Sequence, residues 1–354
     1  MLNFSQKAQN SSVLQKSFSI SVFPKNLPVD LVASLVRQIK YNVKKKTIMK
    51  YNFNPTEENI DEVAKTVIFS GSYEDTPEIS ELTVEEGVLE IAENAFRDFE
   101  NLKSVTLPKS LERISASAFS GCKNLTRVNF SRGVTEIGDE AFAYCPSLTE
   151  IVMPDTVLRI GEGAFEGCAA LTHVKISESC EMIGSGAFSY CFNLRDVTIS
   201  DSVLLVEFNA FASCFSLEGV KLSLSMGMID ESTFEGCRSL KSVDLPPKLY
   251  KIGRRAFKGC SSLDSLILPI TLREIGFDAF SGCKSLSRIA IPRGLIEIED
   301  GDAFSGCDSL SEITYAGDKE SWEYLNRGKT LTVRRSDLSY VSPKIHFLDL
   351  KHEV

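Results

Sequence analysis

One apolar pattern repeats through most of the chain with a period of 23 residues. Every unit contains a phenylalanine, and the last unit is one residue longer because of an insertion between Ile298 and Ala303. A fixed period in the range of roughly 20 to 50 residues is typical of a solenoid, in which each unit stacks on the next. The repeated phenylalanines are Phe96, Phe119, Phe142, Phe165, Phe188, Phe211, Phe234, Phe257, Phe280 and Phe304.

Each unit predicts one short strand followed by a return segment. Apolar side chains two residues apart, such as Val197 and Ile199, point to the same side of an extended chain, and the residue between them points outward. The later A-F-x-G-C segment predicts a helical turn that brings the chain back on the opposite face. We therefore expect an α/β repeat solenoid, with a curved parallel β-sheet of about 11 short strands and helical-turn returns.

The pattern divides the chain into residues 1–78, a non-repeat N-terminal α/β cap or small domain, residues 79–317, the solenoid, and residues 318–354, a C-terminal cap. A solenoid needs caps because its terminal units expose apolar edges. In the first part we expect strands at residues 18–23 and 47–53, and helices from Asp30 and at residues 55–65. In the last part we expect a short helix with Trp322 and Leu325, and strands at residues 330–334 and 345–348.

The repeat unit resembles that of the BspA-like branch of the leucine-rich-repeat family. Residues 239–246 (SLKSVDLP) match the strand half of the family's unit, and residues 251–260 (KIGRRAFKGC) match its return half. The resemblance covers about two-thirds of the chain and implies a solenoid fold. For function it implies adhesion or other protein-binding roles, commonly in microbes that live with a host, and many members of the family are secreted or anchored at the cell surface.

Composition predicts a packed, soluble protein. Hydrophobic residues make up 43% of the chain and charged residues 25%, which differs from the composition of a disordered protein. No apolar run approaches the roughly 18 residues that a membrane-spanning helix needs. The first thirty residues lack the basic start and unbroken apolar stretch of a secretory leader, so we expect a cytoplasmic protein. The family resemblance leaves a secreted or surface location as the alternative.

Charge is distributed unevenly along the chain. The net charge is −9, yet residues 1–50 hold nine lysines or arginines and one acidic residue. An acidic body argues against nucleic acid as the main partner, because a phosphate-binding surface needs clustered basic side chains. The run Lys44-Lys45-Lys46 follows an amphipathic helix and leaves open a contact with an anionic membrane or nucleic acid, although such a run is more often a solvated turn.

Ten cysteines invite a search for disulfides, metals or catalysis. Nine of them occupy one position of the repeat, and Cys180 replaces a valine of neighbouring units, so we expect reduced thiols in the core; disulfides and a metal site are the alternatives. There is no C-x-x-C pair, and three histidines are too few for typical zinc spacing, so we expect no metal and no cofactor. The insertion Asp300-Gly301-Asp302 fits a solvated loop better than a calcium site.

The outward residues between and beside the apolar strand positions form the predicted binding surface. A long solenoid face gives many weak contacts, with the binding energy concentrated in a few of them, so we expect a protein partner and no enzymatic activity. The face has no row of exposed aromatic side chains, which argues against binding of sugars or stacked bases. On the predicted concave face, the candidate residues are Arg127, Asn129, Glu150, Val152, His173, Lys175, Asp196, Lys221, Asp244, Ile267 and Arg288.

Three functional hypotheses remain open from the sequence. The leading one is a protein-binding solenoid that works as an intracellular scaffold or an exported effector. The second is a surface-exposed or secreted adhesin that binds host or matrix proteins. In the third, residues 1–78 are an active module that the repeats only target; their lack of histidine, cysteine and a glycine-rich phosphate loop argues against it.

Overall fold

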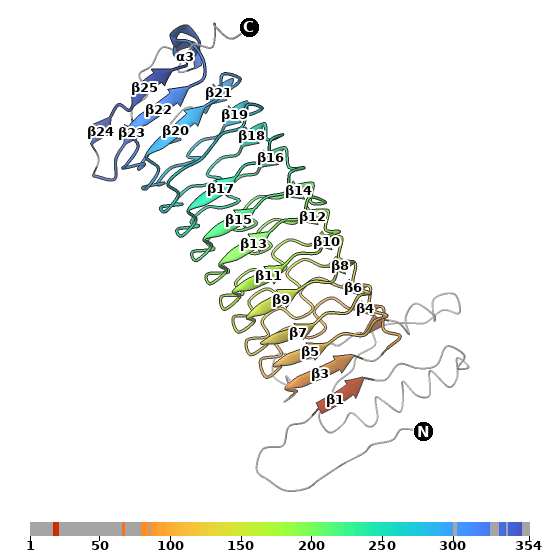
Figure 1. Cartoon of the computed structure of the whole chain (residues 1–354). Helices are drawn as coiled ribbons and strands as arrows, with labels where there is room; N and C mark the ends of the chain where they lie inside the picture. The colour runs from red at the N-terminus through yellow and green to blue at the C-terminus, as the bar shows by residue number, and fades with distance from the viewer. Residues whose placement is uncertain are drawn as a thin grey trace, which may run out of the picture.

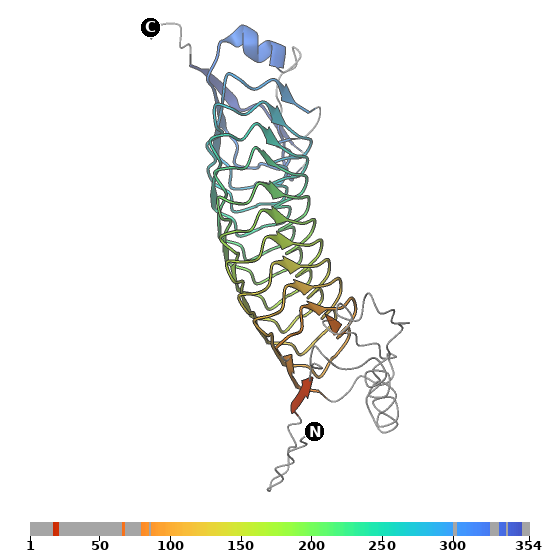
Figure 2. The ribbon, with the colours of Figure 1, turned by 90° about the vertical axis from the view of Figure 1, so that its right-hand side faces the viewer.

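The protein is an elongated stack of coils. The coils follow one another in the order of the chain, from β3 (Glu81–Val84) near the N-terminal end to β22 (Glu312–Tyr315) near the C-terminal end (Figure 1). The computed structural model describes residues 17–20, 66–67, 79–84, 86–299, 303–325, 333–337 and 339–348. The stack is bowed along its length when seen from the side (Figure 2). The expected helices and the second strand of residues 1–78, and the insertion at Asp300-Gly301-Asp302, lie outside the described residues.

The first strand of each coil belongs to the surface that we call the front sheet. Its strands run parallel, and most are paired in register with the strand of the adjacent coil, so that Val174 lies between Ile151 and Val197. They are β1 (Ser17–Ile20), β3 (Glu81–Val84), β5 (Ser104–Thr106), β7 (Arg127–Asn129), β9 (Glu150–Val152), β11 (His173–Lys175), β13 (Asp196–Thr198), β15 (Gly219–Lys221), β17 (Ser242–Asp244), β20 (Arg288–Ile291), β22 (Glu312–Tyr315) and β25 (Lys344–Phe347).

A second, shorter strand in each coil forms a separate row along the side of the stack. In most of these strands an isoleucine points into the core, and its neighbour in sequence is exposed or half-buried. These strands are β2 (Thr66–Val67), β4 (Glu90–Ile91), β6 (Arg113–Ile114), β8 (Glu136–Ile137), β10 (Arg159–Ile160), β12 (Met182–Ile183), β14 (Leu205–Val206), β16 (Met228–Ile229), β18 (Lys251–Ile252), β19 (Glu274–Ile275) and β21 (Glu297–Ile298).

All but one of the predicted parallel strands form, but their pairing is broken in two places, of which one is between β7 and β9. Between residues 79 and 317, ten of the eleven expected strands are present in the front sheet. The remaining one, around Ile267, keeps only a single bridge, to Ala290. The sheet is therefore divided between β17 and β20, and the interruption lies within the predicted binding face.

The helical returns that the sequence analysis expected are not confirmed, because the return segments are turns. Their backbone groups bond to the next coil rather than along their own segment: the amide of Phe165 donates to the carbonyl of Ala187 over 2.8 Å, and the amide of Gly167 donates to Ser189. Several return residues, such as Gly163 and Gly167, also have positive φ, which an α-helix does not accommodate. The architecture is a β-solenoid, and the part of the chain described here has one helix, α3 (Lys319–Leu325).

The repeated phenylalanines form a continuous stack through the core. From Phe96 to Phe304, adjacent rings lie 5.2 to 5.7 Å apart between centroids and are nearly parallel. Each ring is almost fully excluded from solvent. Offset parallel stacking suits the quadrupoles of the rings, so one residue type can fill the same space in every coil.

The C-terminal residues close the stack partly as expected. Trp322 and Leu325 of α3 are buried, and the Trp322 ring lies 5.2 Å from that of Tyr315. The two expected strands correspond to β23 (Val333–Arg334) and β25, of which β25 extends the front sheet by pairing with β22. β23 pairs instead with β24 (Tyr340–Val341) in an antiparallel hairpin. The limits of the three predicted parts of the chain stay a prediction.

One return position has a left-handed backbone in every unit, and most units place glycine there. Gly236 has φ of 77° and Ser213, one unit earlier, has φ of 60°. A Cβ added to Gly236 would meet no atom closer than 3.5 Å, so space is available and only the backbone conformation opposes a side chain. A residue with a Cβ is strained in this conformation, whereas glycine is not.

We therefore predict opposite effects for substitutions at the same position in adjacent units. Ser213→Gly should raise the free energy of unfolding, and Gly236→Ala should lower it, each by on the order of 1 kcal/mol. Chemical denaturation monitored by circular dichroism measures both. Equal signs for the two variants would contradict the assignment of backbone strain to this position.

Candidate functional site

Two rows of side chains point outward from the front sheet and include all the predicted site residues. The first row contains Arg127, Glu150, His173, Asp196 and Arg288, one from each strand that carries them. Strand register places His173 directly between Glu150 and Asp196. These rows arise because alternate strand residues face the core and the solvent, as the burial pattern of β9 to β13 shows.

The second row lies two residues further along each strand. Lys175 is flanked by Val152 and Thr198, and Lys221 is paired in register with Asp244. Among the predicted residues of this row, Asn129 is the one nearest the N-terminus and Ile267, at the interrupted strand, is the one nearest the C-terminus. The structure therefore brings the predicted residues onto one side of the stack, across two breaks in strand pairing, and their position on the concave side stays a prediction.

Few of these side chains are engaged within the chain. His173 Nδ1 lies 3.6 Å from Asp196 Oδ2, and Lys175 Nζ lies 3.6 Å from Asp155 Oδ1. Asn129 donates a hydrogen bond to the hydroxyl of Thr106 over 3.2 Å. Among the residues that the structure describes, the remaining charged members of the face form no ion pair: Arg127, Glu150, Lys221, Asp244 and Arg288.

Two apolar members of the face are strongly exposed. Val152 is 51% exposed and Ile267 is 82% exposed. Ile270 lies just beyond the interrupted strand, is 83% exposed, and was missed by the sequence analysis. The signal for it was the segment Ile267-Leu268-Pro269-Ile270, in which two isoleucines replace the aspartate and second proline of the preceding unit.

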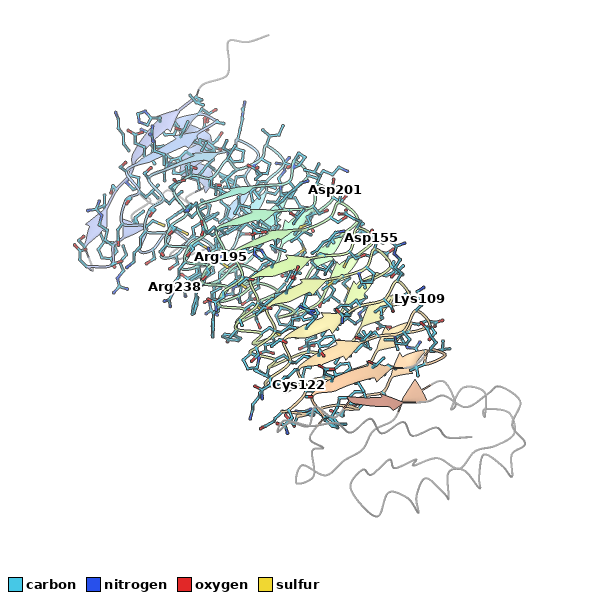
Figure 3. All side chains as sticks on the ribbon, turned by 60° about the horizontal axis from the view of Figure 1, so that its bottom comes forward. Lys109, Cys122, Asp155, Arg195, Asp201 and Arg238 are labelled. Atoms are coloured by element: carbon cyan, nitrogen blue, oxygen red, sulfur yellow. The ribbon has the colours of Figure 1, made fainter. Side chains whose placement is uncertain are left out.

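Exposed aromatic residues also escaped the sequence analysis because they lie beside the front sheet rather than on it. Tyr144, Tyr190, Phe192 and Phe215 occupy return segments that precede the strands, and Arg238 lies next to them. Arg195 and Arg238 lie along one edge of the sheet, and Lys109, Asp155 and Asp201 along the other (Figure 3). In the other units these positions hold no aromatic residue: they are glycine, serine, proline, alanine or charged residues, and this difference was the available signal.

The ten cysteines are buried and unpaired, as expected. The nine repeated thiols donate to the backbone of the coil before, as Cys168 Sγ does to the carbonyl of Phe142 over 3.2 Å. Burial raises the pKa of the Cys168 thiol to about 12 and that of Cys180 to about 11. A buried, protonated thiol is a poor nucleophile, so Cys168 and His173 do not form a catalytic pair.

Within the described ranges, no group of three or more histidine, cysteine, aspartate or glutamate side chains is arranged to hold a metal ion. In those same residues, no helix has both the length and the apolar character needed to cross a membrane.

The stack of parallel coils defines a repeat solenoid, and the sequence of its coils identifies the family. The model of the BspA type leucine rich repeat region, which contains six copies of the unit, matches residues 66–195, 135–263 and 204–325. Together these matches cover most of the chain. The protein belongs to the BspA-type leucine-rich-repeat family.

Several solved structures are similar to this chain. A leucine rich cell surface protein from Faecalibacterium prausnitzii is 27% identical, with 70% of this chain and 82% of that one covered and a TM-score of 0.42. A leucine-rich repeat protein from Bacteroides ovatus is 26% identical, with 76% and 84% covered and a TM-score of 0.43. The T. pallidum Leucine Rich Repeat protein is 27% identical, with 62% and 91% covered and a TM-score of 0.44. No curated protein sequence matches the chain.

The raised thiol pKa values predict a loss of stability at alkaline pH. Burial raises the pKa of Cys168 and Cys237 to about 12, compared with about 8.5 for an unfolded cysteine. The folded state therefore holds these protons more tightly, and the stabilisation is complete below the unfolded pKa and is lost as pH rises toward the folded one. Over that window each thiol should lower the free energy of unfolding by about 1.4 kcal/mol per pH unit.

We expect the double variant Cys168→Ala, Cys237→Ala to have a shallower alkaline slope than the wild type, by about 2.7 kcal/mol per pH unit between about pH 9 and pH 11. Urea unfolding at a series of pH values measures the slope. Leu171→Ala is the control, because it removes buried volume without removing a titrating group. Identical slopes in the wild type and the cysteine variant would show that these thiols ionise alike in both states.

Proposed function

We propose that the protein is a non-enzymatic binding solenoid that holds a protein partner on the outward rows of its front sheet. The observation that carries this proposal is the set of exposed charged side chains, namely Arg127, Glu150, Lys221, Asp244 and Arg288, that form no ion pair within the described chain. They are fixed on parallel strands rather than on long loops, so a partner orders few groups on binding.

Both signs of charge lie on the face, which suits recognition of a particular protein surface. Complementary charges steer association and penalise partners with like charges in the same positions. Val152 and Ile267 add exposed apolar area among the charged groups. Buried apolar contacts of this kind supply affinity, while the charged positions around them select the partner.

An affinity capture from lysate of the native organism tests the role of the face. The variant reverses four charges, Arg127→Glu, Lys175→Glu, Lys221→Glu and Arg288→Glu, and should lose the partner that the wild type retains. The expected loss is at least about tenfold in recovered partner, corresponding to about 1.4 kcal/mol or more. Quantitative mass spectrometry of the captured proteins measures it.

The matched control reverses four exposed basic residues at the corner that follows the front strands: Lys109→Glu, Arg132→Glu, Lys248→Glu and Arg293→Glu. It changes the net charge by the same amount, so it separates a local effect from a general one. A partner retained by both variants, or lost from both, would count against the front sheet. No enriched partner with the wild type would count against a binding role in the cell.

For the compartment, we propose a reducing one, with a scaffold or effector role inside a cell. Support comes from the ten unpaired thiols, because proteins matured in oxidising compartments commonly pair their cysteines. The alternative, a secreted or surface-exposed adhesin, follows from the roles found in the family. We further propose that the basic segment of residues 1–50 can make a weak contact with a membrane.

The thiol state of the native protein distinguishes these compartments. Alkylation during lysis under denaturing conditions, followed by intact mass measurement, should add ten alkyl groups to the protein from a cell interior. A sample reduced before alkylation serves as the reference for complete labelling. Masses lower by pairs of alkyl groups, in protein recovered from the cell exterior, would favour the adhesin.

A further inference from the structure

A group of aromatic side chains lies beside the front sheet. Tyr144, Tyr190 and Phe192 are exposed and Phe215 is half-buried, and ring contacts join Tyr190, Phe192 and Phe215. We call Tyr144, Tyr190, Phe192, Phe215 and Arg238 the aromatic strip. Phe192 and Phe215 stack with 4.9 Å between ring centroids, and the edge of Tyr190 meets Phe192 at 6.2 Å. The guanidinium carbon of Arg238 lies 4.4 Å from the centroid of the Phe215 ring. The strip therefore crosses several coils, with an arginine at its C-terminal end.

These rings do not fill the core. Tyr144 is 55% exposed, Tyr190 48% and Phe192 38%, whereas the repeated core phenylalanines are buried. Contiguous exposed aromatic surface is uncommon on a protein that acts alone and marks surfaces that meet a partner. The protein interior thus does not explain why aromatic residues occupy these positions.

The backbone adds to the case for the strip, because the fold requires a left-handed conformation at this position and a tyrosine tolerates it less well than glycine. Tyr144 and Tyr190 have φ of 55° and 59°, at the return position that is glycine in most other units. A bulky residue with positive φ is an outlier, and such strain tends to persist where function requires it. The ring of Tyr144 lies against the next coil, where a Cβ on Gly167 would be only 2.8 Å from Tyr144 Cδ1.

The charges beside the rings indicate the chemistry of the partner. The side chains of Arg195 and Arg238 are exposed and form no ion pair within the described part of the chain. The nearby Lys241 is neutralised by Glu218, at 2.9 Å. The strip therefore offers ring faces with two available guanidinium groups, which bind carboxylates and stack on planar groups.

We propose that the aromatic strip is a second binding surface, separate from the front sheet, that takes an acidic segment of a partner protein carrying aromatic or proline side chains. Tyrosine and arginine are the residues that most often dominate binding energy at protein interfaces. Carboxylates of the segment pair with Arg195 and Arg238, and its apolar side chains lie against Phe192 and Tyr190. The proposal does not depend on a ligand for the front sheet.

Selection from a random peptide library displayed on phage, with the full chain immobilised, tests this proposal. Enriched peptides should combine aspartate or glutamate with aromatic or proline residues. Phe192→Ser with Phe215→Ser should weaken binding of a selected peptide at least about tenfold. Serine is the natural residue at this position in a later unit, Ser261, so the variant is expected to fold, and circular dichroism checks that it does.

Matched variants make the result specific. Tyr250→Ser removes an aromatic side chain of similar exposure outside the strip and should leave peptide binding unchanged. The four-fold charge reversal of the front sheet should also leave it unchanged, so this proposal and the function of the front sheet can fail separately. Arg195→Glu with Arg238→Glu should abolish binding of the acidic peptides, and a new selection on that variant should enrich lysine and arginine.

Four outcomes would overturn the proposal: enrichment of neutral or basic peptides, binding that survives Phe192→Ser with Phe215→Ser, equal loss in Tyr250→Ser, or no enrichment at all. Binding on an array of immobilised glycans that depends on Phe192 and Phe215, without peptide enrichment, would assign the strip to carbohydrate and also overturn the acidic segment as its partner.

Discussion

The structure depends on hydrogen bonding between coils at a fixed register. A coil cannot satisfy its own backbone, because its strands are short and its returns are turns; the amides of Phe165 and Gly167 instead donate to carbonyls of the next coil. An unpaired buried backbone group is costly, so each coil requires a neighbour of matching length. The constant period of the sequence is the result of this requirement, and the parallel rows of side chains on the surface follow from it.

The same register explains why the core repeats residue types as well as polarity. A position in one coil meets its equivalents in the coils before and after, so a side chain has to pack well against copies of itself. Phenylalanine does so through offset stacking, and cysteine does so because it is small and donates to the carbonyl of the preceding coil. The thiols are consequently structural, and their raised pKa values follow from burial rather than from a reactive site.

The sequence alone could identify the strands, because outward and inward positions alternate there and Val197 and Ile199 mark the buried side. It could not identify the returns correctly, since the A-F-x-G-C segment has the local pattern of a helical turn and the competing hydrogen bonds reach 22 residues along the chain. The sequence also could not predict the loss of strand pairing at Ile267, because the apolar pattern continues through that segment. Strand register lays the candidate residues out in the same outward rows, and their role in binding stays a prediction. The ion pairs on that side required coordinates.

A repeat protein provides an internal comparison that bears on function. Residues that are the same in every unit meet the shared demands of stacking, so they identify the fold and reveal little about a partner. A residue that differs from the other units at an outward position is not explained by stacking, so it can report on a partner. Tyr190 stands where most units have glycine. Phe192 and Phe215 stand where the other units have no aromatic residue, and Ile267 stands where most units have a polar residue.

These departures fall on two surfaces of one rigid stack, and this arrangement has a physical consequence. If both surfaces are occupied at once, the solenoid fixes the distance between two partners without a flexible linker, so binding of one raises the local concentration of the other. A catalytic site needs several groups that converge on one reacting atom. In parallel rows on a regular stack, the side chains are instead spread out along the length of the stack. The proposed binding role agrees with this geometry, because a protein partner can meet many positions along the rows at once.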